Sequence, residues 1–160
     1  MRYLPAIFAL TLAACAHLEH PATKSAEDSK TVTLNDGSNI RVPPRFVLEE
    51  RIGDNPVVFG KIRDSDTLKE IEYRSGSVFG MPYDYADFYN RKEAGDTILK
   101  HSKGISHGLH YNLSITRNQS GDEILYISFP KPNYTCFFTK VNSPSDIQAM
   151  KRIILTFRQK

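Results

Sequence analysis

The sequence has few cysteines, no long hydrophobic run and little excess of charge of one sign. Its 160 residues include 21 basic and 18 acidic residues, scattered among one another without a basic stripe. This balance argues against a nucleic-acid partner, which selects for a basic patch. The apolar run at residues 4–12 is interrupted by Pro5 and Thr11. It is far too short to cross a bilayer as a helix, so a membrane-spanning anchor is not expected there.

The N-terminus has the features of a signal peptide. Arg2 precedes the apolar run, which ends in Leu12-Ala13-Ala14-Cys15. Small residues before a cysteine at this position resemble the lipobox of bacterial lipoprotein precursors. The resemblance implies cleavage before Cys15, a diacylglycerol on the Cys15 thiol and an acylated amino group on the same residue.

Lipidation at Cys15 implies a location at a membrane. Two or more acyl chains hold a protein stably, at roughly 0.8 kcal/mol per buried methylene. Ala16 follows the cysteine in place of an aspartate, which resembles the signal that sorts lipoproteins to the outer membrane. We therefore expect a lipid-anchored protein of the bacterial outer membrane that faces the periplasm. The alternative is an ordinary secretory signal cleaved after Ala14 or Ala16, which would leave Cys15 free or remove it.

The rest of the chain divides into a tether and one domain. Residues 1–14 form the predicted signal peptide, and residues 15–30 form the acylated N-terminus and a flexible tether. This tether is polar, contains Pro21 and has no apolar periodicity. About fifteen such residues span at most about 50 Å, so the domain stays close to the membrane. Residues 31–160 are predicted to form a single globular domain.

The two cysteines do not predict a disulfide. A lipidated Cys15 has no thiol to pair, which leaves Cys136 alone between Thr135 and Phe137 in an apolar stretch. A redox or nucleophilic thiol needs a histidine or a basic neighbour, and the sequence places none beside Cys136. We therefore expect Cys136 to be buried and unreactive.

Alternating apolar residues and turn residues predict strands in the first half of the domain. Residues 31–42 have the pattern of a β-hairpin whose turn lies at residues 35–38. Residues 57–62 and 68–73 have the pattern of a second strand pair. The segment 83–100 is expected to be helical in part.

Three strands and a helix are predicted in the last third of the chain. Residues 109–115, 123–129 and 134–141 are strand-like and joined by short links, which indicates an antiparallel meander. Ser143 followed by Pro144 is typical of a helix start. The helix should lie on the sheet through one apolar face, formed by Ile147, Met150, Ile154 and Phe157.

This order of hairpin, strands, helix, meander and terminal helix over residues 31–160 resembles the α/β sandwich of the PsbP and Mog1-like group. The resemblance implies an α+β fold in which helices flank an antiparallel β-sheet. That group consists mostly of binding proteins, so the resemblance also implies a non-catalytic role. It carries no residue role over to this chain.

Residues 104–108 read G-I-S-H-G and match the G-x-S-x-G nucleophile elbow of serine hydrolases. In that elbow a helix follows the serine, and the catalytic acid and histidine come later in the chain. Strand-like alternation follows Ser106 instead, and the last histidine is His110. We expect a glycine-rich loop between elements, and a small serine hydrolase using Ser106 is the less favoured alternative.

Three histidines, His101, His107 and His110, raise the question of a metal site. Residues three apart on a strand point to opposite faces, so His107 and His110 converge only if His107 lies in the preceding loop. Neither Asp122 nor any cysteine is spaced to complete a zinc pattern. We expect solvated or capping histidines, no metal site and no cofactor.

Residues 79–89 form the most aromatic segment of the chain. Aromatic side chains with a polar edge dominate binding hot spots, so this segment is the candidate surface for a partner or a ligand. The alternative is that the same side chains pack a loop and a helix onto the sheet. The candidate surface consists of Phe79, Met81, Tyr83, Tyr85, Phe88 and Tyr89.

Together these features predict a membrane-anchored envelope lipoprotein and not an enzyme. Its domain is expected to bind another envelope protein, as an assembly factor, as a subunit of a complex or as an immunity protein against a periplasmic toxin. The alternative is a ligand-binding or chaperone-like lipoprotein that holds an apolar molecule.

Overall fold

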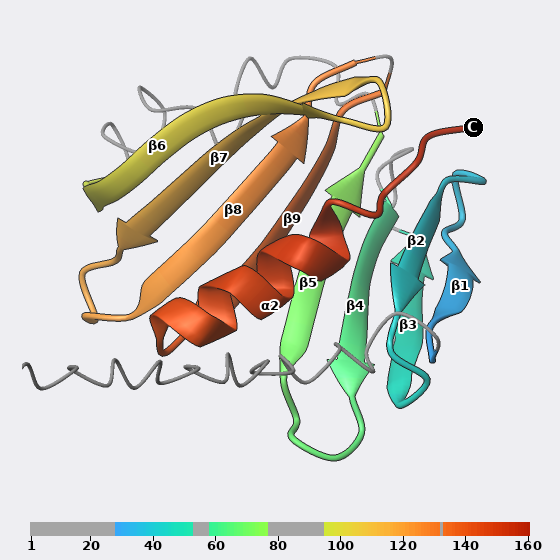
Figure 1. Ribbon diagram of the computed structural model, residues 1–160, viewed down its shortest axis with the longest axis horizontal. Helices are drawn as coiled ribbons and strands as arrows, with labels where there is room; N and C mark the ends of the chain where they lie inside the picture. The colour runs from blue at the N-terminus through green and yellow to red at the C-terminus, as the bar shows by residue number, and fades with distance from the viewer. Residues whose placement is uncertain (1–27, 53–57, 77–94, 132) are drawn as a thin grey trace, which may run out of the picture.

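Strands predominate in the computed structural model, which describes residues 28–52, 58–76, 95–131 and 133–160. Two short strands form a hairpin, β1 (Lys30–Thr33) and β2 (Asn39–Val42). Seven further strands form one sheet: β3 (Phe46–Ile52), β4 (Val58–Asp64), β5 (Glu70–Ser75), β6 (Thr97–Ser106), β7 (Leu109–Arg117), β8 (Glu123–Phe129) and β9 (Thr135–Val141). The helix within these ranges is α2 (Pro144–Ile154), numbered as in Figure 1.

All neighbouring strands of the large sheet are antiparallel, in the order β3-β4-β5-β9-β8-β7-β6. Strands β3 to β5 form one meander and strands β6 to β9 form another (Figure 1). The two meanders meet where β5 pairs with β9, with Tyr73 opposite Phe137. The last strand of the chain therefore lies near the centre of the sheet, and β3 and β6 lie at the edges of the strand order.

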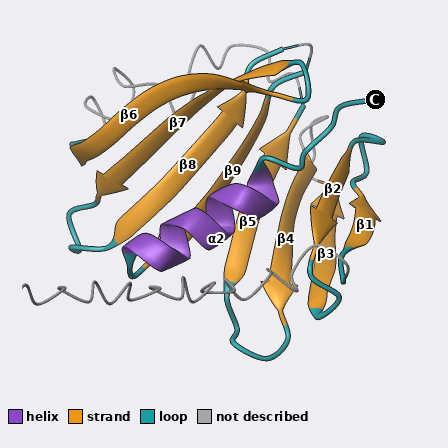
Figure 2. Cartoon of the chain, in the orientation of Figure 1, coloured by secondary structure: helices purple, strands orange, loops and turns teal. Residues whose placement is uncertain are grey.

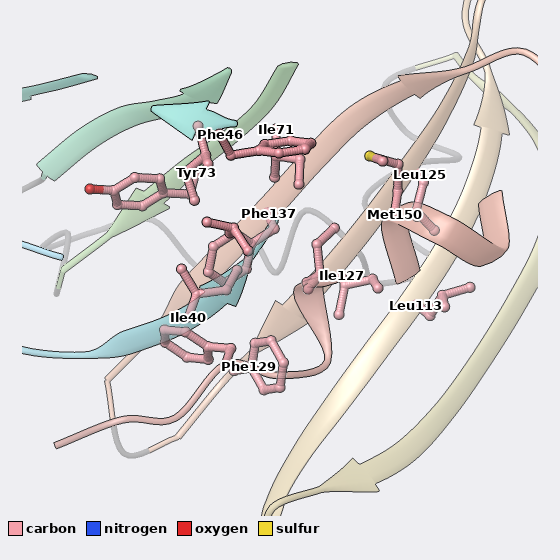
Figure 3. Packing of buried hydrophobic residues seen from close by; sticks show 14 of the residues in the cluster. Ile40, Phe46, Ile71, Tyr73, Leu113, Leu125, Ile127, Phe129, Phe137 and Met150 are labelled. Carbon is pink, nitrogen blue, oxygen red and sulfur yellow. The ribbon is translucent and has the colours of Figure 1, made fainter. Parts of the chain in front are cut away.

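One face of the sheet is covered by α2 and by the β1–β2 hairpin (Figures 1 and 2). Because side chains alternate between the faces of a strand, every second residue points into the layer beneath these elements. Figure 3 shows part of this core, including Phe129 and Phe137. The ring centroid of Phe137 lies 6.2 Å from that of Phe129 and 5.0 Å from that of Phe157. The largest fully buried side chains are Tyr73, Phe46, Phe129, Phe137, Phe157, Leu34, Ile40, Ile62, Ile71, Leu125, Ile127 and Ile154.

Helix α2 begins as the sequence predicts. The Ser143 hydroxyl accepts a hydrogen bond from the Asp146 N–H at 3.1 Å, and Pro144 occupies the first turn. Asp146 also forms an ion pair with Lys69, which fastens the start of the helix to the residue just before β5. The helix buries Met150 and Ile154, as expected from the apolar stripe.

The structure corrects the predicted extent of this helix. Regular helix ends at Ile154, and Phe157 lies beyond it. Phe157 is nevertheless fully buried, because a tight turn continues the chain and the Phe157 N–H donates to the Ile154 carbonyl at 3.1 Å. The apolar spacing therefore identified a core residue correctly while overstating the length of the helix.

The β1–β2 hairpin is joined to the C-terminal segment and to the sheet. The N–H groups of Asn39 and Arg158 each donate to the other residue's carbonyl at 2.8 Å, so the C-terminal segment runs beside β2. In the hairpin turn, the Asp36 carboxylate accepts a hydrogen bond from the Ser75 hydroxyl. The Asn35 N–H donates to the Glu50 carboxylate at 3.0 Å. These bonds hold the predicted hairpin over the strands β3 and β5.

The strands β3 and β6 were not predicted, and the helical expectation for residues 83–100 is wrong at its end. Thr97–Lys100 belong to β6. Residues 83–94 lie outside the described residues. Within the described ranges one helix lies on the sheet, where the sequence predicted helices in the plural. The predicted antiparallel sheet, hairpin, meander and terminal helix are confirmed.

Candidate functional site

Two of the predicted sites lie outside the residues that the structure describes. These are the lipidation site at Cys15 and the aromatic surface formed by Phe79, Met81, Tyr83, Tyr85, Phe88 and Tyr89. Both stay predictions. The candidate surfaces below are therefore built from the described sheet and helix.

Ser106 does not have the surroundings of a nucleophile elbow. It is the last residue of β6, and its hydroxyl donates to the Leu155 carbonyl at 2.7 Å. His107 and Gly108 follow with φ of 50° and 79°, which makes a two-residue hairpin turn into β7. A strand follows the serine where the elbow requires a helix. The expected loop is confirmed at His107 and Gly108, whereas Gly104 to Ser106 belong to the strand.

The histidines are spread over three different positions. His101 lies in β6 opposite Ser114, His107 lies in the hairpin turn, and His110 lies in β7 opposite Ile105. Over the described ranges, no group of three or more His, Cys, Asp or Glu side chains is placed to hold a metal ion. Asp122 forms an ion pair with Lys140 at 2.6 Å.

Cys136 on β9 is buried, as the sequence predicts, and forms no disulfide among the described residues. It lies directly opposite Arg74 in the β5–β9 pairing. This position places Cys136 on the sheet face away from α2.

That second sheet face carries a row of aromatic and arginine side chains. The Arg74 guanidinium lies 5.4 Å from the ring centroid of Phe59 and 5.6 Å from that of Phe138. Phe138 stacks on Tyr126 with centroids 5.9 Å apart and ring planes 22° apart. Val47 at 51% exposure and Phe59 at 41% are open to solvent. We call Val47, Phe59, Arg74, Tyr126 and Phe138 the outer face.

Charged side chains border the outer face on β3, β4 and β5. Arg63 contacts Glu70 at 2.6 Å and Glu49 at 3.6 Å, while Lys61 contacts Glu70 at 3.1 Å and Glu72 at 3.6 Å. The hydrogen bond from Lys61 lowers the pKa of Glu70, partial burial opposes this, and Arg63 lowers the pKa further. These half-exposed pairs add little to stability, but they keep the border of the outer face charged and ordered.

A pocket of about 370 Å³ lies on the other side of the sheet, at the end of α2. It is bounded by the first described residues, Asp28 and Ser29, by the end of β2 with the loop that follows, and by the last turn of α2. We call it the arginine pocket, because three arginines line it above an apolar floor. The arginines are Arg41, Arg45 and Arg152, and the floor includes Val42, Met150 and Ile153.

The three arginines differ in how they are held. The Arg45 Nε donates to Asp64 at 2.6 Å, and this hydrogen bond is the main reason that the pKa of Arg45 is raised. An Arg41 Nη donates to the Ser29 hydroxyl at 2.7 Å. The Arg152 side chain has no hydrogen bond or ion pair to the residues that the structure describes. At least one guanidinium of the pocket is thus available to an anion.

Comparisons with known proteins identify a similar fold. No protein-family model and no curated protein matches the sequence. The solution structure of the cyanobacterial PsbP protein (CyanoP) from Synechocystis sp. PCC 6803 matches with a TM-score of 0.57 and 12% identity, over 89% of this chain and 99% of that chain. The chain has a PsbP-like fold. The predicted sandwich is therefore confirmed, and at this identity the likeness concerns the fold alone.

Sequence reasoning missed both described surfaces. The outer face had a signal, because Phe59, Lys61 and Arg63 alternate along β4, and Glu70, Glu72 and Arg74 alternate along β5. The arginine pocket had no signal in the sequence, because its arginines come from parts of the chain more than 100 residues apart.

Among the described helices, none is long and apolar enough to span a bilayer.

Proposed function

We propose that this chain is a lipid-anchored protein of the bacterial cell envelope whose domain binds another protein and catalyses no reaction. The observation that carries the binding role is the outer face, where the exposed Phe59 and the partly buried Phe138 flank Arg74 within a charged border. In this proposal the lipid is on Cys15, and the domain faces the periplasm from the outer membrane.

The anchor is supported by the sequence before the domain. Small residues precede Cys15 at the end of a short apolar run, in the arrangement of a lipobox. Asp28, the first described residue, follows Cys15 by 13 residues. Such a stretch reaches at most about 45 Å when fully extended, so the tethered domain would meet partners close to the same membrane.

The outer face has the composition of a protein interface. Tyrosine, phenylalanine and arginine are enriched at binding hot spots, and a polar, charged rim usually surrounds them. Arg74 is already placed between two rings, so less side-chain entropy is lost when a partner contacts it.

Site-directed photocrosslinking tests the binding role in the native membrane. A photoreactive phenylalanine analogue in place of Phe59 should form one dominant adduct with another envelope protein. The same analogue in place of Ile105, which is exposed on the same sheet face at the far strand β6, is the control and should not form that adduct. Arg74→Glu should remove the adduct while the domain stays folded. Equal adducts from positions 59 and 105 would refute the outer face as the binding surface.

A further inference from the structure

We propose that the arginine pocket binds the phosphate headgroup of an anionic phospholipid in the membrane that holds the protein. This inference rests on the proposed anchor at Cys15 and concerns the side of the sheet away from the outer face. It assigns the pocket an orienting role, in which the membrane contacts the domain at the end of α2.

The position of the pocket relative to the tether is the first argument. Asp28 and Ser29 line the pocket, so the chain that leads back to Cys15 leaves the domain at the pocket's rim. Ser29 also accepts a hydrogen bond from Arg41 at 2.7 Å, which fixes this exit beside an arginine. A tether that ends at the rim keeps the pocket close to the lipid surface in the anchored protein.

The chemistry of the lining is the second argument. Arginine forms paired hydrogen bonds with phosphate and is less strongly hydrated than lysine, so it suits a partly buried phosphate site. The lining contains three arginines and one carboxylate, Asp28, and a second carboxylate, Asp64, pairs with Arg45 from outside the lining. Arg45 engages Asp64 through Nε, and its side chain remains 51% exposed. Met150 and Ile153 give the floor an apolar surface that suits the glycerol and upper acyl region of a lipid.

The end of a helix normally repels an anion, because its last carbonyls carry partial negative charge. Here Thr156 offsets this effect. Its hydroxyl donates to the Ile153 carbonyl at 2.7 Å, and its N–H donates to the same oxygen at 3.0 Å. Lys151 and Arg152 in the last turn add positive charge beside the pocket. The terminus is therefore compatible with a phosphate.

Vesicle co-sedimentation tests the proposal without the anchor. The protein used is the chain from residue 15 to residue 160 with Cys15→Ala, which retains every described element and cannot be acylated. It should bind vesicles of phosphatidylcholine with phosphatidylglycerol and not vesicles of phosphatidylcholine alone. Raising the salt concentration from 0.1 M to 1 M should abolish binding, because the Debye length falls from about 10 Å to about 3 Å.

Matched arginine variants separate a site from general attraction. Arg152→Gln should weaken binding about fivefold, and Arg41→Gln with Arg152→Gln about 25-fold, as expected for about 1 kcal/mol per basic residue near an anionic surface. Arg117→Gln, the control, makes the same charge change at an exposed residue paired with Glu123 at the end of β7. It should bind like the parent, and all variants should keep the parent's melting temperature.

Three results would overturn the inference. The first is equal weakening by Arg117→Gln, which would show attraction by net charge alone. The second is unchanged binding by the double variant. The third is release from the vesicles by inorganic phosphate at millimolar concentration, which would show a site for free phosphate. Loss of acylation at Cys15 would contradict the proposed anchor but not this binding, so the two failures are distinguishable.

Discussion

Asp64 is a buried carboxylate, 3% exposed, that joins the loop after β2 to the turn after β4. Burial alone would raise its pKa, but hydrogen bonds from Arg45 and from the Asp66 N–H outweigh burial and lower the pKa. Because the pKa of Asp64 is lower in the folded state than in the unfolded state, the ionised Asp64 carboxylate stabilises the fold at pH values above about 4. This stabilisation is lost as the pH falls through the folded-state pKa.

Asp64→Asn should lower the free energy of unfolding by about 1–3 kcal/mol at pH 7, because Arg45 and the Asp66 N–H lose a charged acceptor that lies at a buried position. The parent's own carboxyl takes up a proton as the pH falls through its lowered folded-state pKa, so the difference between the two proteins should be smaller at pH 2. Urea titrations at both pH values measure it. A penalty of the same size at pH 2 and pH 7 would show that charge at Asp64 is not the cause.

Glu50 has the opposite linkage. Burial raises its pKa, and the hydrogen bond from the Asn35 N–H offsets this only in part. Ionisation of Glu50 therefore costs free energy in the folded state, and stability falls as the pH rises from about 4.3 through the raised pKa. Glu50→Gln keeps an acceptor oxygen for Asn35. Its stability relative to the parent should increase between pH 4 and pH 7 in thermal melts, and a constant difference would count against this assignment.

At the scale of elements, local signals identified the hairpin, the meander and α2 from the sequence. Turn residues near Gly37 and the cap at Ser143 act over a few positions, so they are visible without the fold. The strands β3 and β6 were missed because they begin the two meanders, each pairing with one neighbour in the strand order. Glu50 points toward the core side of β3, and β6 alternates poorly, with Leu99 and Ile105 both exposed. Their strand conformation depends on pairing with β4 and β7.

The stripe on α2 is expected to stabilise the domain by burial. Ile154→Ala should cost about 2–5 kcal/mol, because it removes a fully buried side chain and leaves a cavity against the sheet. Ile147→Ala, at a partly buried position on the same helix, should cost less. Thermal unfolding of both variants measures the difference. A melting curve for Ile154→Ala that matches the parent's would mean that α2 does not depend on this contact.

Gly60 in β4 makes room for an aromatic side chain on the neighbouring strand. Tyr73 lies directly opposite, and its buried ring covers Gly60 so closely that a methyl group there would overlap it. Gly60→Ala should destabilise the protein by about 1–3 kcal/mol, because the ring must move within a packed core. Gly104→Ala meets Tyr111 in the same way, but Tyr111 is only partly buried. Its cost in urea titrations should therefore be smaller, and the reverse order would contradict this explanation.

At the scale of the whole molecule, the two proposed surfaces lie on opposite sides of the sheet. The arginine pocket is on the side that α2 covers, and the outer face is on the other. Under our proposals, a domain docked to the membrane through the pocket would present the outer face toward the periplasm. The arrangement would let one small sheet contact a lipid surface and a protein partner at once.

The sequence predicted the kind of fold better than the surfaces. Periodicity indicated an antiparallel sheet with a terminal helix, and the PsbP-like fold is confirmed. The arginine pocket could not be predicted, because Arg41 and Arg152 become neighbours only after the hairpin packs beside α2. The predicted lipid anchor is the reverse case, since its whole signal lies in a few residues before Cys15.

The most direct test of the central claim is metabolic labelling with palmitate followed by membrane fractionation. The native chain should incorporate the label, sediment with membranes and begin at a modified Cys15 by mass spectrometry. The Cys15→Ala variant should take up no label and be recovered either in the aqueous phase or as an uncleaved precursor. Recovery of the native protein in the aqueous phase, with no lipid on its first residue, would contradict the proposed anchor.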